Sequence, residues 1–210
     1  MLDSQFLLKT IGRPVLRSFI IISLAVASGS FFSGCGIQSL PENKNQVDAS
    51  LAEVMNQYKR RSDLIPNLVE TVKGYAKHEE STLEGVIAAR AKASSVTIDP
   101  SKVTPEQLQK FQAAQGGLSQ ALGRLMVVSE KYPELKANQN FIGLQSQLEG
   151  TENRIAVARN RYIESINGFN NLVTVPPTSF TNSLFFHYDK MPQFGGDMTT
   201  EEKQAPKVKF

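Results

Sequence analysis

The sequence predicts an all-α protein: an elongated, antiparallel, up-down helical bundle that follows an N-terminal signal or anchor segment. Composition favours this class, because Trp is absent and Ala, Leu, Gln, Glu and Asn are plentiful. Apolar residues also recur in alternating steps of three and four over long stretches, which is the spacing of one face of a helix. The connections between these stretches are short, and short connections make amphipathic helices antiparallel neighbours.

The first 34 residues have the organisation of a signal peptide. Lys9, Arg13 and Arg17 form a basic opening, and the chain is then apolar from Phe19 to Phe32. A membrane-spanning helix needs about 20 consecutive apolar residues, whereas this stretch is shorter and is interrupted by Ser and Gly. We therefore expect residues 1–34 to be a signal peptide rather than a permanent span.

The only cysteine, Cys35, follows Phe32, Ser33 and Gly34, and this stretch resembles the lipobox of bacterial lipoproteins. The resemblance implies cleavage before Cys35, a diacylglycerol on its sulfur and an acylated new N-terminus. At about 0.8 kcal/mol per buried methylene, several acyl chains make a durable anchor. The domain would then face the periplasm or the cell exterior, on either the inner or the outer membrane. Two alternatives stay open: an uncleaved single-pass anchor in the inner membrane, and soluble secretion.

Residues 35–43 are expected to be a short polar tether, and we expect the helical bundle to occupy residues 44–194. Its first apolar seam consists of Val47, Leu51, Val54, Tyr58, Ile65, Leu68 and Val72. Pro66 interrupts this seam, and proline costs about 3 kcal/mol inside a helix but is tolerated in a first turn. Since Ser62 or Asp63 can cap a new start, we expect two nearly collinear helices, 44–61 and 63–94, with the break near Pro66.

The second of these helices contains a polar run at residues 77–82. This run either faces solvent or forms a buried polar layer, and the sequence leaves both interpretations open. The apolar stripe resumes after it, at Leu83, Val86, Ile87 and Arg90.

A clear helix start follows a loop at residues 94–103. Thr104 is placed to be the N-cap, Pro105 the first helical residue, and Gln107 the partner in a capping box. Pro133 ends this helix. Its seam consists of Leu108, Phe111, Gln115, Leu118, Leu122, Leu125, Ser129 and Tyr132.

Asn138 or Asn140 can cap a final long helix, which ends where Val175 precedes two prolines. Its seam includes Phe141, Leu144, Leu148, Thr151, Ile155, Ala158, Tyr162, Phe169 and Leu172. The aromatic segment at 179–194 is expected to pack back on the bundle, and residues 195–210 are expected to be a disordered tail.

Two pairs of glycines, Gly116 with Gly123 and Gly143 with Gly150, are each seven residues apart within predicted helices. An interior glycine costs about 1 kcal/mol relative to alanine. The repeated spacing indicates either a close approach of two helix backbones or glycines that are tolerated at the surface.

Three long runs of sequence carry a resemblance to a known family. They are RRSDLIPNLVETVKGYAKHEESTLEGVIAARAKA, LGRLMVVSEKYPELKANQNFIGLQSQLEGTENRIAVARNRYIESINGFN and FFHYDKMPQF. With them the chain resembles the LemA family of bacterial membrane-associated proteins over about residues 46–194. The resemblance implies an all-α antiparallel bundle held at the membrane by its N-terminus, and no established enzymatic activity. Two departures are a lipobox in place of a plain transmembrane anchor and a tail from Gly195 that lies outside the shared pattern.

The sequence contains no recognisable motif for catalysis or for a cofactor. His78 and Glu79 are followed by Thr82 where a zinc-binding His-Glu-x-x-His motif needs its second histidine, and Tyr75 stands where a di-iron bundle needs Glu. The mature chain is nearly neutral and has no basic stripe, so nucleic acid is not an expected partner. We expect no catalytic residue, metal ligand or cofactor.

Glu152 and Arg154 adjoin the core seam of the last long helix. They either pair within that helix, at about 0.2–0.5 kcal/mol a pair, or meet Asp63, Asn67 or Glu70 and fix the bundle register or a partner surface. We predict a non-enzymatic, membrane-anchored interaction protein of the cell envelope, with membrane lipid on Cys35 and an envelope protein as partners. The alternative is a bundle that binds a small ligand or lipid between its helices.

Overall fold

The computed structural model describes residues 38–194, and these residues form two compact units. The larger unit contains residues 43–171 and 190–194, and the smaller unit contains residues 38–42 and 172–189. The expected signal peptide at 1–34, the lipidation site Cys35 and the expected disordered tail at 195–210 lie outside the described residues.

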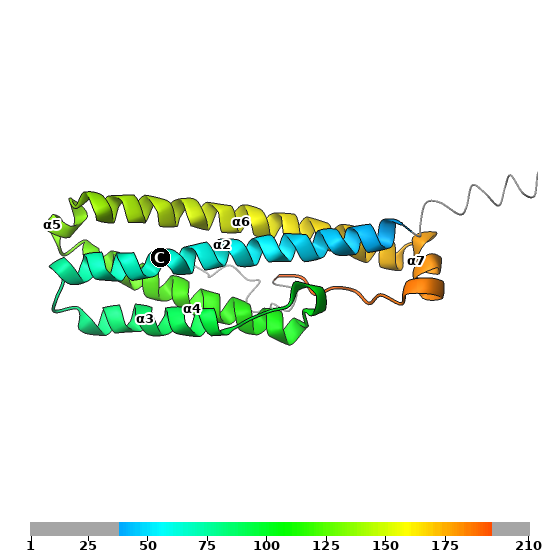
Figure 1. The fold of residues 1–210 in the computed structure, drawn as a ribbon, viewed down its shortest axis with the longest axis horizontal. Helices are drawn as coiled ribbons and strands as arrows, with labels where there is room; N and C mark the ends of the chain where they lie inside the picture. The colour runs from blue at the N-terminus through cyan, green and yellow to red at the C-terminus, as the bar shows by residue number, and fades with distance from the viewer. Residues whose placement is uncertain (1–37, 195–210) are drawn as a thin grey trace, which may run out of the picture. The chain divides into compact units, whose positions relative to one another are not determined.

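Four long helices run side by side in the larger unit (Figure 1). They are α2 (Ser39–Tyr75), α3 (Glu80–Ser95), α4 (Pro105–Ser129) and α6 (Gln139–Thr174), and α2 and α6 also extend into the smaller unit. A short 3-10 turn, η1 (Pro100–Lys102), lies between α3 and α4, and α5 (Pro133–Lys136) lies between α4 and α6. Residues 38–194 contain no strand, so the predicted all-α antiparallel bundle is confirmed.

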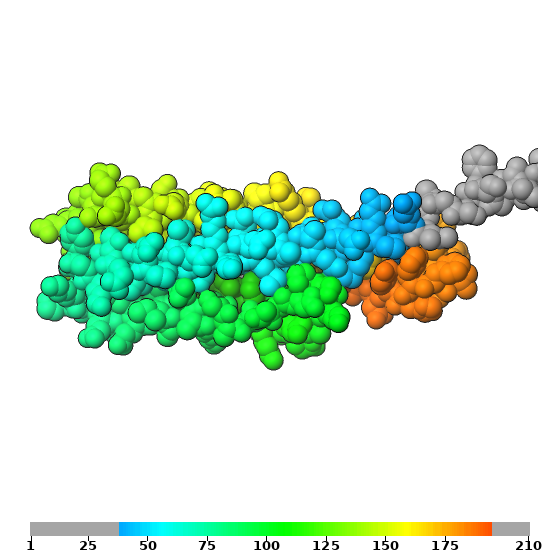
Figure 2. Space-filling model, viewed as in Figure 1, coloured from blue at the N-terminus to red at the C-terminus, as the bar shows by residue number. Residues whose placement is uncertain are grey.

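The core of the larger unit is built from the predicted apolar seams. In the space-filling view the surface of α2 lies between the surfaces of α6 and α3 (Figure 2), and the inner face of each helix is buried. The predicted seam residues that lie on α2 and α4 are buried as expected. Tyr132 is only partly buried and follows the end of α4 at Ser129, and Ile87 on α3 is 52% exposed. An apolar core cluster includes Ile65, Leu68, Val72, Val86, Leu118, Leu125, Phe141 and Leu148.

Helix α2 continues through Pro66, so the predicted break near this residue is wrong. Proline lacks the N–H that would bond the carbonyl of Ser62, one turn earlier in the helix. In the structure the Nε of Arg90 on α3 donates to that carbonyl oxygen at 2.9 Å. A side chain of the neighbouring helix thus supplies the hydrogen bond that α2 loses.

Helix α2 also begins earlier than predicted, at Ser39 rather than at residue 44. Residues 39–43 of the expected tether are therefore helical. Pro41 lies in the first turn of α2, where a missing N–H has no helical partner to lose.

The chain turns back at residues 76–79, so the prediction of one continuous helix over 63–94 is wrong. These residues instead form the end of α2, the turn, and the antiparallel helix α3. The polar run at 77–82 forms this turn and the start of α3, and His78 is exposed there. Of the two interpretations of the run, the solvent-facing one is correct. Asn138 reaches this end of the bundle and donates its Nδ2 to the Tyr75 hydroxyl at 2.8 Å.

The predicted helix caps of α4 and α6 are confirmed. The Gln107 backbone N–H donates to Thr104 Oγ1 at 3.2 Å, and the Thr104 N–H donates to Gln107 Oε1 at 3.1 Å, which completes the capping box. Asn138 Oδ1 accepts from the backbone N–H groups of Asn140 and Phe141 at 2.9 and 3.1 Å.

Residues 190–194 pack on α6 as predicted. Asn170 exchanges two hydrogen bonds with the backbone of Met191, at 2.9 and 3.2 Å. The Tyr162 hydroxyl donates to the Pro192 carbonyl at 3.3 Å, and Phe194 meets the Tyr162 ring edge-on at a centroid distance of 5.1 Å.

The smaller unit contains α7 (Thr178–Thr181) and a single π-helical turn, η2 (Asn182–Phe186). Asn182 closes this segment, since its side chain bonds the backbone N–H and carbonyl of Tyr188 at 2.9 and 3.0 Å. Phe180, Leu184 and Phe185 are 71%, 70% and 62% exposed. Residues 179–189 belong to the smaller unit, so the expectation that this part of the aromatic segment packs back on the bundle stays a prediction.

The paired glycines do not mark close contacts between helices. A Cβ atom placed on Gly116, Gly123 or Gly143 would have no neighbour within 4 Å, and one on Gly150 would meet only the Arg154 side chain, at 3.6 Å. The alternative interpretation, that these glycines are tolerated at the surface, is correct.

Candidate functional site

Arg61 is the one charged residue that is buried among residues 38–194, with 1% of its surface exposed. It follows Tyr58 by three residues and precedes Ile65 by four, so it occupies the same seam of α2 as the apolar core residues. Burying a charge is strongly unfavourable unless the group is paired and hydrogen-bonded. The surroundings of Arg61 are therefore the most specific polar feature of the bundle.

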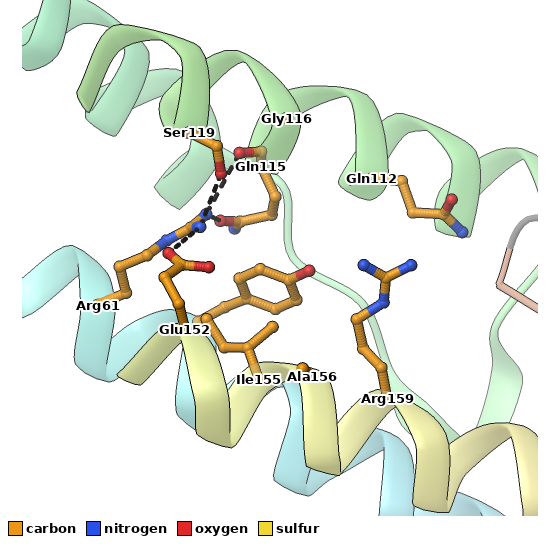
Figure 3. A pocket seen from close by; sticks show the side chains of 10 residues that line it. Arg61, Gln112, Gln115, Gly116, Ser119, Glu152, Ile155, Ala156 and Arg159 are labelled. Carbon is orange, nitrogen blue, oxygen red and sulfur yellow. Dashed lines mark hydrogen bonds and ion pairs between the residues drawn. The ribbon is translucent and has the colours of Figure 1, made fainter. Parts of the chain in front are cut away.

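The Arg61 guanidinium connects α2 with both α4 and α6 (Figure 3). Nη2 donates to the carbonyl oxygen of Gln115 at 3.2 Å and to its Oε1 at 2.7 Å. Nη1 donates to Ser119 Oγ at 2.9 Å and to Glu152 Oε1 at 2.7 Å. Charge-assisted hydrogen bonds of this kind are stronger than neutral ones, so one side chain fixes the register of three helices.

A cleft of about 300 Å³ lies beside Arg61 and is lined by residues of α2, α4 and α6 (Figure 3). The Tyr58 ring lies 5.0 Å from the Arg61 guanidinium and meets Phe111 edge-on at 5.2 Å. Arg159 also lines the cleft, and its guanidinium stacks on the Phe194 ring at 5.1 Å. Within residues 38–194, no carboxylate forms an ion pair with Arg159.

The cleft carries two cationic side chains and one carboxylate. Burial raises the pKa of the Tyr58 hydroxyl, and the positive charges of Arg159 and Arg61 oppose that rise. The hydroxyl therefore stays protonated at neutral pH, where it can donate or accept a hydrogen bond. An excess of guanidinium over carboxylate suits the binding of a small anion.

The sequence left open whether Glu152 and Arg154 pair within α6 or meet Asp63, Asn67 or Glu70, and the described residues show neither arrangement. Glu152, which is half-exposed, pairs with Arg61 of α2. Arg154 is exposed and its Nη2 donates to Thr151 Oγ1 of the same helix at 2.8 Å. Asp63, Asn67 and Glu70 are exposed on α2, and in the described part of the chain they form no ion pair with Glu152 or Arg154.

Asn67 and Glu70 line a shallow groove between α2 and α6, together with Thr71, Gln139, Asn140, Gly143, Leu144 and Gln147. Residues 38–194 contain no group of three His, Cys, Asp or Glu side chains that is placed to hold a metal ion. Over the same residues, no helix combines the length and apolar character needed to cross a bilayer.

Arg61 was missed as a site residue, although the sequence carries a signal for it. The predicted seam of α2 runs in alternating steps of four and three, and its one vacant place between Tyr58 and Ile65 is position 61. Gln115 is a polar member of the predicted seam of α4 in the same way. Polar residues at core positions of facing helices indicate a buried polar contact.

Comparison with known proteins gives consistent matches. A sequence model of the LemA family matches residues 50–210. Protein LemA of Metamycoplasma hominis is 23% identical over 167 residues, which cover 79% of this chain and 73% of that protein. The match extends through the end of the chain, so the expectation that the tail from Gly195 lies outside the family pattern is wrong.

Two further relatives are described as magnetosome proteins. Magnetosome protein MamQ of Magnetospirillum gryphiswaldense is 28% identical over 170 residues, which cover 68% of this chain and 60% of that protein. Magnetosome protein MamQ 2 of Paramagnetospirillum magneticum is 29% identical over 156 residues, with 64% and 55% covered. The matches thus span less than two thirds of each of these relatives.

Proposed function

Because this chain belongs to the LemA family, we propose that it is a membrane-anchored, non-enzymatic scaffold of the bacterial cell envelope, which binds an envelope protein through the outer faces of its bundle. Membership of the family supports an association with membranes. The lipobox before Cys35 supports a lipid anchor as the form of that association, with the bundle facing the periplasm or the cell exterior.

The observation that carries the scaffold proposal is the way the bundle uses Arg61. Its two terminal nitrogens make four hydrogen bonds to Gln115, Ser119 and Glu152. The buried charge of the described core is therefore committed to holding α2, α4 and α6 in register. A bundle fixed in this way presents rigid outer faces, which suits binding of a partner.

The anchor is tested by the intact mass of the purified, membrane-extracted protein and of its Cys35→Ser variant. We expect the native protein to begin at Cys35 and to carry the mass of the acyl groups. The Cys35→Ser variant should keep its first 34 residues and lack that mass. A native protein without acyl groups would overturn the lipid anchor and favour an uncleaved segment or soluble secretion.

The partner is tested by photo-crosslinking in intact cells. A photoreactive amino acid is placed singly at Ile87, Val127 or Val157, which are 52%, 67% and 50% exposed on α3, α4 and α6. Exposed Glu70 on α2 serves as the polar control position. We expect a discrete adduct with one envelope protein from at least one apolar position, and adducts from none of them would contradict the proposal.

A second candidate function, small-anion binding, is favoured by Arg159. This guanidinium lines the cleft beside Arg61 without an ion-pair partner among residues 38–194. Native mass spectrometry of the purified protein should then show a small anionic adduct. The adduct should disappear in Arg159→Gln and persist in Arg161→Gln, which changes an exposed arginine outside the cleft.

A further inference from the structure

The smaller unit displays an apolar surface made of Phe180, Leu184 and Phe185, here called the apolar face. These side chains are 71%, 70% and 62% exposed. Phe180 and Leu184 are four residues apart along a helical stretch, so they lie on the same side of it, and Phe185 directly follows Leu184. Single exposed apolar residues are common, whereas three large ones gathered together mark a surface that meets something other than water.

The segment that carries the apolar face is uncharged over a long distance. Residues 172–188 contain no Asp, Glu, Lys or Arg, and His187 is their only ionisable group apart from the tyrosine hydroxyl. A face that contacted a charged protein surface would be expected to carry complementary charges at its rim. An uncharged, aromatic-rich segment instead matches the composition of the boundary between lipid headgroups and acyl chains.

The apolar face is held in place by contacts within its own unit. The Asn182 side chain clasps the backbone of Tyr188 through two hydrogen bonds. The Phe186 and Tyr188 rings stack at 5.6 Å with an interplanar angle of 4°. Phe186 thereby turns toward Tyr188, and Phe180, Leu184 and Phe185 remain outside this closed turn.

The beginning of the described chain belongs to the same unit. Residues 38–42 form a compact unit with residues 172–189, and only positions 36 and 37 separate Gln38 from Cys35. Three steps of extended chain span at most about 11 Å. An acylated Cys35 would therefore hold this unit within about that distance of the membrane surface.

We propose that the apolar face inserts into the headgroup and acyl-chain boundary of the membrane that holds Cys35. This inference rests on the lipid anchor proposed above and adds a second attachment to it. A lipid chain and an interfacial apolar face act together, since the first contact raises the effective concentration of the second. The smaller unit is then the membrane-contacting part of the protein.

The test uses the absence of tryptophan from the chain. The full-length, membrane-extracted protein is prepared with Phe185→Trp as a single fluorescent reporter and reconstituted on vesicles of phosphatidylethanolamine and phosphatidylglycerol. Val127→Trp, at a 67% exposed site on α4, is the matched control. Leu184→Trp is an independent second reporter in the apolar face, and circular dichroism checks that each variant is folded.

Vesicles with brominated acyl chains then report contact with lipid, because bromine quenches a nearby indole. We expect the emission of the Phe185→Trp and Leu184→Trp variants to shift to shorter wavelength on vesicles. Brominated lipid should remove more than about half of that emission. The Val127→Trp control should show neither change. Protein that floats with the vesicles while its reporters behave like the control would overturn the proposal.

The remaining results of the vesicle experiment also decide whether the apolar face inserts into lipid. A shift to shorter wavelength without bromine quenching means that a protein, such as a second copy of this chain, covers the face, and overturns the lipid assignment. Protein that does not float with vesicles contradicts membrane insertion as well. The intact mass at Cys35 judges the lipid anchor separately, so failure of the apolar face is distinguishable from failure of the anchor.

Discussion

Arg90 on α3 completes the helical hydrogen bonding of α2 by donating its Nε proton to the carbonyl oxygen of Ser62, at 2.9 Å. That carbonyl is the one that Pro66 leaves without a donor. A proline that would be expected to break the helix thus creates an acceptor for the neighbouring helix. The same interaction tethers α3 against α2 close to the Ser62 and Ser94 hydroxyls, which lie 3.1 Å apart.

Replacing Arg90 with methionine should lower the free energy of unfolding by about 1–3 kcal/mol, because the buried Ser62 carbonyl loses its donor. In a Pro66→Ala background the helix regains the N–H of residue 66, and Arg90→Met should then cost less than about 1 kcal/mol. Urea unfolding of the four proteins in this cycle measures both values. Lys92→Met, at an exposed position of α3, is the control. If Arg90→Met cost the same free energy of unfolding in the native and Pro66→Ala backgrounds, Arg90 would not be the donor that replaces the missing N–H.

The pairing of Glu152 with Arg61 predicts an unequal response to mutation. Glu152→Gln removes the counter-ion of the buried Arg61 guanidinium and should destabilise the bundle by about 1–3 kcal/mol. This loss is smaller than that expected for a fully buried ion pair, because Glu152 is 48% exposed. Glu70→Gln, at an exposed site of α2, should change stability by less than about 0.5 kcal/mol. In an Arg61→Met background, Glu152→Gln should hardly change the free energy of unfolding. If Glu152→Gln destabilised that background as much as it destabilises the native protein, the pairing would be contradicted.

The buried hydroxyl of Tyr162 leads us to predict that the folded protein loses stability in alkali. Burial, reinforced by the nearby Asp48 carboxylate, raises the pKa of its hydroxyl well above the ordinary value. The neutral Tyr162 hydroxyl contributes its full stabilisation to the folded protein below the unfolded-state pKa of about 10. This contribution is lost as the pH rises further, because Tyr162 ionises in the unfolded chain before it ionises in the folded one. Tyr162→Phe should therefore reduce the slope of unfolding free energy against pH above about pH 10. Urea titrations at neutral and alkaline pH measure this slope, and equal slopes for both proteins would count against the assignment.

Much of the fold follows from local patterns. The seams of α2, α4 and α6 were predictable because a 3.6-residue period places their apolar residues on one face. Thr104 and Asn138 were predictable as caps because capping depends on residues within one turn. The continuation of α2 through Pro66 was not predictable, because its compensation comes from Arg90, which is distant in sequence and becomes a neighbour only after the chain turns at 76–79.

The candidate site was less accessible from sequence. Glu152 was recognised as a polar residue beside the seam, but its partner was sought among Asp63, Asn67 and Glu70, which face outward. The vacant seam position held by Arg61 was the missing signal. Whether a polar seam residue points inward depends on the partners across the bundle, and Gln115 and Ser119 become those partners only through the packing of α4.

Gly123 offers a direct test of how closely the helices approach. A Cβ atom at this position would have no neighbour within 4 Å, and α4 is helical there. Gly123→Ala should therefore raise the free energy of unfolding by about 0.5–1 kcal/mol, since alanine restricts the unfolded chain without a clash in the folded one. The reverse change on the exposed side of the same helix, Ala113→Gly, should lower it by a similar amount. If another helix backbone instead pressed against Gly123, alanine would force the two helices apart and the free energy of unfolding would fall. The sign of the change that a urea titration measures for Gly123→Ala therefore distinguishes a close helix contact from a tolerated surface glycine.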